Sequence, residues 1–378
     1  MSTELEAFVR DLLLTDHHCH GVMTADLDRP AFEALINEGF DLPPEGTSHL
    51  DSPVGLAVRR WCAPVLDLEP LAAPERYLER RAEVGAEEAS RRLLRQAGLG
   101  HLIVETGYRS SEVTDAQGTG ELADVPASEV VRLEAVAEQV AASGVEATGY
   151  ADAFRAELAA RCARAVGLKT IVAYRGGFAF DPRPPAEAEV AEAAGRWLAA
   201  GGGRLTDPVL LRFAIWAGAE LARDHAMPLQ VHSGWGDPDL TLHLADPSLL
   251  TDLVKDLGRM GVNVVFLHCY PYHRQAAYLA AVLPNVYFDV GEAITYLGPS
   301  ATRLLAEALE LAPFTKQLYS SDAFGLAELY LIGAAHFRHG LAEVLGAWVD
   351  DGRCSAADAE RIAHLVAAGN AARIYPAR

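Results

Sequence analysis

Three histidines stand close together near the start of the chain, in the run Thr15-Asp16-His17-His18-Cys19-His20. They follow three consecutive leucines, which predict the buried part of a short strand. Residues i and i+2 of a strand share a face, so His18 and His20 point the same way and His17 and Cys19 point away from them. Two imidazoles side by side predict a metal site, because imidazole is the commonest zinc ligand. The alternative is a solvated turn.

Further residues able to bind a metal or move a proton stand at or near the ends of later apolar runs: Glu105, Lys169, His232, His268 and Asp322. The run that begins at Leu13 and seven later apolar stretches predict eight strands. The later seven lie at 99–108, from Glu129 onward, and at 167–174, 227–232, 261–268, 285–290 and 317–322. Alternation of strand and helix indicates parallel strands with right-handed crossovers. The sequence therefore predicts an α/β fold, a (β/α)8 barrel.

The barrel explains how residues far apart in the sequence could meet. In such barrels the carboxyl ends of all strands open on one face, where active sites lie. Residues 22–98 contain no strand-like run and several prolines, so we expect a helical insertion there, after the first strand. No linker stands out, and one domain over residues 1–378 is expected. Further helices are predicted at 3–11, 186–200, 209–225, 327–349 and 356–368.

The composition excludes several classes of protein. A net charge of −20, from 52 acidic and 32 basic residues, opposes binding to nucleic acid or to an acidic membrane. Five irregularly spaced cysteines do not form a disulfide framework. The acidic start of the chain does not resemble a signal peptide, and no apolar run is long enough to span a membrane. A cytoplasmic protein is expected.

The local motifs resemble those of the metal-dependent amidohydrolase superfamily. The motifs are His18-x-His20, Val-His-Ser-Gly around His232, Leu-His-Cys-Tyr-Pro around His268, and Ser-Ser-Asp ending at Asp322. Within it, the chain is most similar to the amidohydrolase-2 branch and to the amidohydrolase domain of FluG-like proteins. In those proteins the domain is fused to a glutamine-synthetase-like domain, which is not expected here. The resemblance therefore implies a separately encoded synthetase-like protein as one partner to consider.

The resemblance also implies a ligand set. His18, His20, His232 and Asp322 would hold a divalent metal, with Zn²⁺ expected first and Mn²⁺ or Fe²⁺ as alternatives. Asp322 would act as general acid and base, and His268 would bind a second metal or polarise the substrate carbonyl. In binuclear relatives a lysine of the fourth strand is carboxylated and bridges two metals. Lys169 could have that role, or could turn outward or pair with Glu105.

The expected reaction is hydrolysis of an amide bond in a small carboxylated substrate, such as a γ-glutamyl amide, by metal-activated water. The alternatives are decarboxylation of an unsaturated or aromatic acid on the same site, and a silent barrel that serves as a partner subunit. Arg175 could pair with a substrate carboxylate, or could equally form a surface salt bridge. Asp237 could also line the site, and a homo-oligomer is possible for a barrel of this size. The remaining predicted substrate-binding residues are Glu105, Trp235, Tyr270 and His273.

Overall fold

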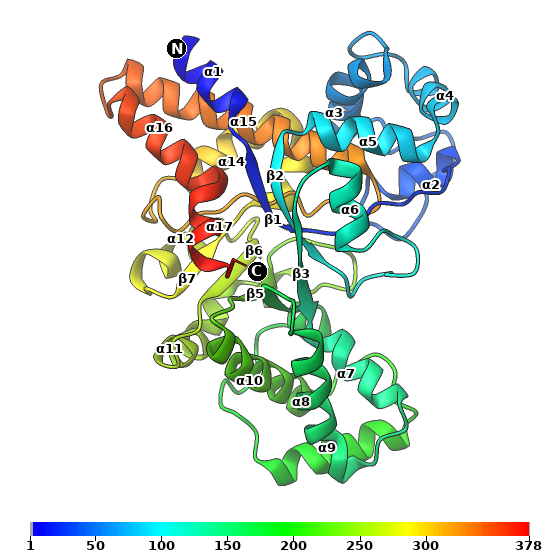
Figure 1. Ribbon diagram of the computed structural model, residues 1–378, viewed down its shortest axis with the longest axis vertical. Helices are drawn as coiled ribbons and strands as arrows, with labels where there is room; N and C mark the ends of the chain where they lie inside the picture. Colours follow the sequence, from blue (N-terminus) through cyan, green and yellow to red (C-terminus); the bar gives the residue numbers. More distant parts are fainter. Residues whose placement is uncertain (1–2, 378) are drawn as a thin grey trace.

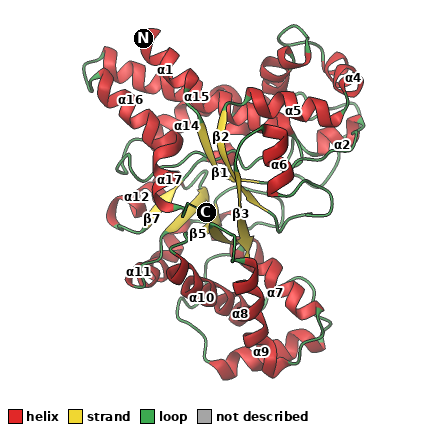
Figure 2. Ribbon diagram, viewed as in Figure 1, coloured by secondary structure: helices red, strands yellow, loops and turns green. Residues whose placement is uncertain are grey.

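The computed structural model describes residues 3–377. Seven parallel strands pair in sequence order and form one curved sheet at the centre of the molecule (Figure 2). Their buried apolar side chains place them in the core. The strands are β1 (Leu14–Cys19), β2 (Leu99–Glu105), β3 (Ala127–Arg132), β4 (Gly167–Thr170), β5 (Leu229–Ser233), β6 (Val264–His268) and β7 (Val286–Phe288).

The eighth predicted strand, residues 317–322, is not a regular strand, although it lies between β7 and β1 and bonds to both. Leu318 N donates to the carbonyl of Phe288 (3.0 Å), and His17 N donates to that of Tyr319 (3.2 Å). The regular pairing is interrupted because the Asp16 carboxylate accepts hydrogen bonds from both the backbone N and Oγ of Ser321. The result is an α/β barrel in which seven of the eight predicted strands are regular.

The helices lie outside the strands. Figure 1 shows α7 (Leu133–Ala142), α8 (Tyr150–Arg161), α9 (Glu187–Ala199) and α10 (Pro208–His225) grouped at one end of the molecule. At the other end, α1 (Thr3–Asp11) packs against α15 (Ala327–Asp350) and α16 (Ala356–His364). All five predicted helices outside the 22–98 region are therefore confirmed. No helix in residues 3–377 is both long and apolar enough to cross a membrane.

Six further helices follow β2 or the later strands. They are α6 (Ala116–Ala123), α11 (Thr251–Arg259), α12 (His273–Val282), α13 (Gly291–Tyr296), α14 (Ala301–Ala308) and α17 (Asn370–Ile374). The chain beyond α17 returns to the strands, where Tyr375 is buried. This return matters for the site, because the Tyr375 hydroxyl lies within hydrogen-bond distance of His17 and Gln230.

Between β1 and β2 the chain forms α2 (Arg29–Ala34), α3 (Pro53–Ala57), α4 (Pro74–Val84) and α5 (Ala86–Gln96). Pro30, Pro53 and Pro74 stand at the beginnings of α2, α3 and α4, where the missing N–H costs nothing. The α4 helix is tied to the barrel by Tyr77 and Arg81, which both donate to the buried carboxylate of Glu328 on α15.

Candidate metal centre

Four histidines and one aspartate predicted from distant strand ends come together in the structure. We call His18, His20, His232, His268 and Asp322 the ligand cluster. Oδ1 of Asp322 lies 3.1 Å from Nε2 of His18 and 3.4 Å from Nε2 of His20. Its Oδ2 lies 3.3 Å from Nε2 of His268, whose ring centre is 4.6 Å from that of His232. Asp322 therefore stands between the two pairs of histidines.

The Nδ1 hydrogen bonds of His18 and His20 direct Nε2 of each ring toward Asp322, and Nε2 of His18 also lies 2.8 Å from Nζ of Lys169. Nδ1 of His18 lies 2.9 Å from Oε1 of Gln230, and Nδ1 of His20 lies 3.1 Å from the carbonyl of Glu105. Since both partners are acceptors, Nδ1 carries the proton and Nε2 keeps its lone pair facing Asp322. Such outer hydrogen bonds orient histidine ligands in metal sites. In His232, Nε2 is bonded to the carbonyl of Trp235 (3.1 Å), which leaves Nδ1.

A second group of polar side chains lies beneath the ligand cluster. We call His17, Gln230, Asp289 and Tyr375 the lower polar layer. His17 contacts Oδ2 of Asp289 (2.8 Å) and the Tyr375 hydroxyl (2.9 Å), and Gln230 donates to the carbonyl of His17 and to Tyr375. His17 thus points away from Asp322, as strand alternation predicts. Cys19 and Cys269 also make buried contacts outside the ligand cluster, to neighbouring carbonyl groups.

Two groups of side chains have the composition and spacing to hold a metal ion: His18, His20 and Asp322 in one, and His232, His268 and Glu292 in the other. Within residues 3–377, both ring nitrogens of His268 and Oε2 of Glu292 are buried and have no hydrogen-bond partner. Buried polar atoms are normally satisfied, so these atoms fit a site that binds a cation. The donor set of nitrogen and carboxylate oxygen suits Zn²⁺.

Two members of the ligand cluster have a left-handed backbone. The φ angle is +68° at His268 and +51° at Asp322. Residues other than glycine seldom adopt this conformation, and each instance costs about 1–3 kcal/mol. Because surrounding packing must hold both residues in it, the strain identifies these positions as sites where side-chain direction is favoured over stability.

Burial and neighbouring groups shift the pKa values of Asp322, His268 and His18. Burial alone would raise the pKa of Asp322, but the neighbouring His268, His18 and His20 hold it well below its ordinary value. Burial lowers the pKa of His268 to about 4 and lowers that of His18 well below the ordinary range. The arrangement therefore favours an ionised Asp322 beside neutral imidazoles at His18 and His268, which is the protonation state that metal binding requires.

Lys169 points into the same centre. Its Nζ lies 2.8 Å from Nε2 of His18, and the residue is 2% exposed. Burial lowers the pKa of its amine. Lys169 therefore does not turn outward, and Glu105 forms its ion pair with Arg132 instead.

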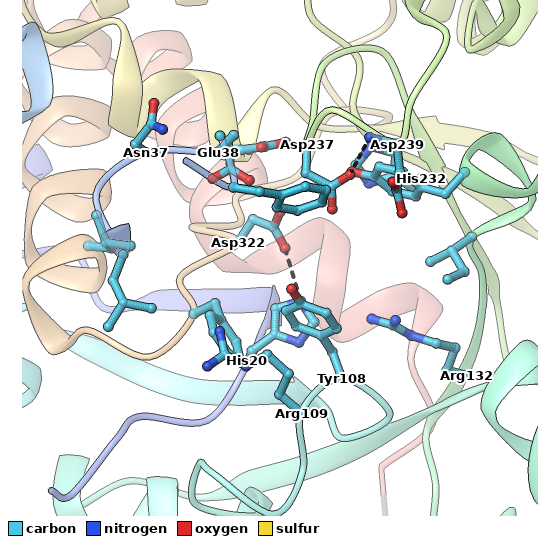
Figure 3. Close-up of a pocket in the computed structure, with 18 of the residues that line it drawn as sticks. His20, Asn37, Glu38, Tyr108, Arg109, Arg132, His232, Asp237, Asp239 and Asp322 are labelled. Atoms are coloured by element: carbon cyan, nitrogen blue, oxygen red, sulfur yellow. Dashed lines mark hydrogen bonds and ion pairs between the residues drawn. The ribbon is translucent and has the colours of Figure 1, made fainter. Parts of the chain in front are cut away.

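A cavity of about 510 Å³ opens above the ligand cluster. Figure 3 shows Asp322 near its centre, with Glu38 and Arg132 on opposite sides of it. Arg175 and Asp237 line this cavity. One wall is formed by residues 34–40, at the end of α2 and beyond it.

Four predicted substrate-binding residues are not among the described residues that line the cavity: Glu105, Trp235, Tyr270 and His273. Glu105 lies behind His20 and is paired with Arg132. The Trp235 ring packs edge-on against Tyr296, 5.0 Å away. His273 contacts Glu307 at 2.8 Å and stacks on Tyr270. Direct contact with a substrate in this cavity therefore remains only a prediction for these four residues.

The residues near the site that were not recognised from the sequence include Glu38, Arg132, Gln230 and Glu292. Gln230 and Glu292 carry usable signals, because Gln230 shares a strand face with His232 and Glu292 follows the end of β7. Arg132 likewise ends β3. Glu38 has no such signal, since it lies in the largely helical segment between β1 and β2.

An α/β barrel with histidines and an aspartate gathered at the carboxyl ends of its strands defines a class of metal-dependent enzymes. The amidohydrolase family model (Amidohydro_2) matches residues 111–377, so this chain belongs to the amidohydrolase family. Over 221 residues the chain is 30% identical to the protein fluG of Emericella nidulans. This matched stretch covers 56% of this chain and 25% of fluG. The chain therefore spans about a quarter of that relative. The predicted family resemblance is confirmed.

Solved structures show the same fold. A protein of Lactobacillus casei ATCC 334, provisionally described as a metal-dependent hydrolase, has a TM-score of 0.84 and 28% identity over 98% of this chain and 96% of its own. A uronate isomerase from Bacillus halodurans C-125 has a TM-score of 0.66 and 15% identity, over 98% of this chain and 95% of its own, and shows the fold alone. Family membership and the first of these structures support a metal-dependent hydrolase.

Proposed function

We propose that this protein hydrolyses an amide bond in a small carboxylated substrate, with γ-glutamyl amides as the first class to test. The observation that carries the proposal is the ligand cluster at the floor of a cavity that is also lined by arginines. A divalent metal, with Zn²⁺ expected, would supply Lewis acidity toward the carbonyl and lower the pKa of water.

Within this reaction, the chain's own residues would position the substrate and move the proton. The ionised Asp322 carboxylate lies among the ligand nitrogens and would accept a proton from the attacking water. It would then pass that proton to the leaving nitrogen. His268 would either bind a metal or polarise the substrate carbonyl, since both of its ring nitrogens lack a partner within residues 3–377.

Lys169 determines which form of the centre is present. Its amine could be carboxylated and bridge two metals, or remain free beside His18. Metal analysis combined with intact-mass measurement separates the two forms. Two metals per chain with a carboxylated lysine would support the bridged form, whereas one metal and an unmodified lysine would exclude it.

The reaction is tested by incubating the metal-loaded protein with a panel of γ-glutamyl amides and of simple carboxylated amides. Release of amine is the expected result, and Asp322→Asn should abolish it. Unsaturated and aromatic acids belong in the same panel, with CO2 as the readout. Release of CO2 without hydrolysis of any amide would replace the proposed reaction with decarboxylation.

Arg175 is the candidate for holding the substrate carboxylate. Its side chain is 10% exposed, and Glu138 lies 3.3 Å from it and fixes its direction. Arg175→Ala is expected to raise KM for carboxylated amides about tenfold or more, the loss of one charge-assisted contact, while metal content stays unchanged. An unchanged KM would remove Arg175 from this role.

A further inference from the structure

Two loops of opposite charge meet on one wall of the cavity, beyond the ends of β4 and β5. These strands are neighbours, and Thr170 pairs with Val231. Arg175 follows this pair by five residues on one strand and Asp237 follows it by six on the other, so similar lengths of chain bring both to the same wall. Both residues line the cavity. Figure 3 shows the Asp237 side chain directed into it.

Arg204 holds these two loops together. It donates one hydrogen bond to the carbonyl of Tyr174 (3.0 Å), the residue before Arg175, and another to the carboxylate of Asp239 (2.5 Å). The backbone N of Asp239 in turn donates to Oδ1 of Asp237 (3.1 Å). One oxygen of Asp237 is therefore held within the loop that Arg204 binds.

The close approach of the loops also requires Gly236. A Cβ at this position would lie 2.0 Å from the Tyr174 hydroxyl and 2.9 Å from Nε2 of His232. The Tyr174 ring lies against His232, with ring centres 4.4 Å apart. The wall that carries Arg175 and Asp237 is thus packed directly against the ligand cluster.

Both charged groups retain capacity for a ligand. Nε of Arg175 is buried without a hydrogen-bond partner within residues 3–377, and its side chain is nine-tenths buried. In the same part of the chain, Asp237 forms no ion pair with a lysine or an arginine within 4.0 Å. Burial raises the pKa of Asp237, against the opposing influence of Arg204 and Arg175, as expected for a carboxylate that lacks a direct cationic partner.

We propose that Arg175 and Asp237 form a binding site for an α-amino acid head group, with the carboxylate on Arg175 and the ammonium on Asp237. An α-carboxylate and an α-ammonium share one carbon, so they need neighbouring opposite charges, which these adjacent loops supply. The inference rests on the proposed amide hydrolysis and narrows it to substrates whose amide lies on the side chain of an amino acid, such as γ-glutamyl amides. Simple carboxylated amides then lack one of the two contacts.

Binding of the acyl product tests this site without requiring turnover. Calorimetry with the metal-loaded protein compares L-glutamate with glutarate, which lacks the ammonium, and with 4-aminobutyrate, which lacks the α-carboxylate. L-glutamate is expected to bind at least tenfold more tightly than either analogue. Equal affinity for L-glutamate and glutarate would overturn the proposal.

Two variants assign the contacts. Asp237→Asn keeps the oxygen that accepts a hydrogen bond from Asp239 but removes the charge. It should therefore lower the affinity for L-glutamate about tenfold and leave the affinity for glutarate unchanged. Arg175→Gln should lower the affinity for both of these ligands and leave the affinity for 4-aminobutyrate unchanged. The matched control is Asp152→Asn, at a side chain that is 94% exposed. Equal weakening of L-glutamate and glutarate by Asp237→Asn would show that this residue does not bind the ammonium.

The outcomes also separate this proposal from the proposed reaction. If the protein hydrolyses γ-glutamyl amides but does not distinguish L-glutamate from glutarate, the head-group site is wrong and the reaction stands. If it binds L-glutamate selectively, with the expected effects of both variants, but hydrolyses no amide, the head-group site stands and the reaction is wrong.

Discussion

The ligand cluster and the lower polar layer are neighbouring groups of buried histidines and carboxylates, but they differ in how their polar atoms are satisfied. In the lower polar layer, both nitrogens of His17 have partners, and Asp289 accepts hydrogen bonds from His17 and from the backbone N of His268 and of Gly291. In the ligand cluster, both nitrogens of His268 lack a hydrogen-bond partner among the described residues.

This difference separates residues that stabilise the fold from residues that bind a ligand, although the two groups contain histidines and carboxylates alike. A fully bonded buried pair maintains the fold, whereas unbonded buried atoms cost free energy unless a ligand satisfies them. The adjacent residues His17 and His18 show the contrast, because strand alternation directs one to each group. The following predictions test it, beginning with the largest expected effect.

His18→Ala is expected to remove metal and to lower the rate of the metal-dependent reaction on the order of 10³-fold or more, since several kcal/mol of transition-state stabilisation depend on the metal. His20→Ala should behave in the same way. Metal content by mass spectrometry and turnover of the best substrate are the measurements. Retention of metal by either variant would remove that residue from the ligand cluster.

His17→Ala is expected to lower the free energy of unfolding by about 3 kcal/mol, because it leaves the buried Asp289 carboxylate without its histidine hydrogen-bond partner. The folded protein should nevertheless retain its metal. Urea denaturation and metal analysis of the same preparation provide both values. Loss of metal with unchanged stability would reverse the assignment of the two layers.

The pH dependence of stability should also report on the lower polar layer. Burial would raise the pKa of Asp289, but the hydrogen bond and charge of His17 lower it to about 2. A carboxyl with a lowered folded-state pKa stabilises the protein above its unfolded pKa near 4, and that stabilisation is lost as the pH falls toward 2.

The expected loss is about 2 kcal/mol across this range. It is measured by urea denaturation of metal-free protein at pH 5 and at successively lower pH. Asp289→Asn is less stable at pH 5 and should lose less on acidification. Parallel pH profiles for the two proteins would contradict this assignment.

Glu292→Gln is expected to have the smallest effect on stability and the opposite sign. Burial raises the pKa of Glu292 well above its ordinary value, and the nearby Glu38 and Asp322 raise it further. Removing this charge should stabilise the metal-free protein by about 1 kcal/mol, while turnover falls. Glu83→Gln, at a half-exposed side chain, is the control. A loss of stability in Glu292→Gln would show that the carboxylate supports the fold.

The sequence predicted those parts of the site that depend on local pattern. A short apolar run followed by a polar residue marks a strand end, and this pattern identified His232, His268 and Asp322 correctly as neighbours. Alternation within β1 likewise separated His17 from His18. The irregular eighth segment could not be predicted, because it depends on Asp16 bonding to Ser321 across 305 residues of sequence.

The missing parts depend on contacts between distant residues. The left-handed backbone of His268 and Asp322 is imposed by packing and has no glycine to signal it. The direction of Lys169 toward His18 was one of several open alternatives, because the sequence does not show whether a strand lysine points into the barrel or out toward the helices. Glu38 reaches the cavity only through the path of the chain after α2.

The position of Tyr375 has a consequence for biosynthesis. Its hydroxyl bonds to His17 across 358 residues and to Gln230, which orients His18. A ribosome makes His18 and His20 long before Asp322 and Tyr375, which stand about 300 or more residues further along the chain. A growing chain therefore presents two histidines without the aspartate or the support beneath them. We expect metal loading to follow synthesis of residue 375 rather than to guide the folding of the first strand.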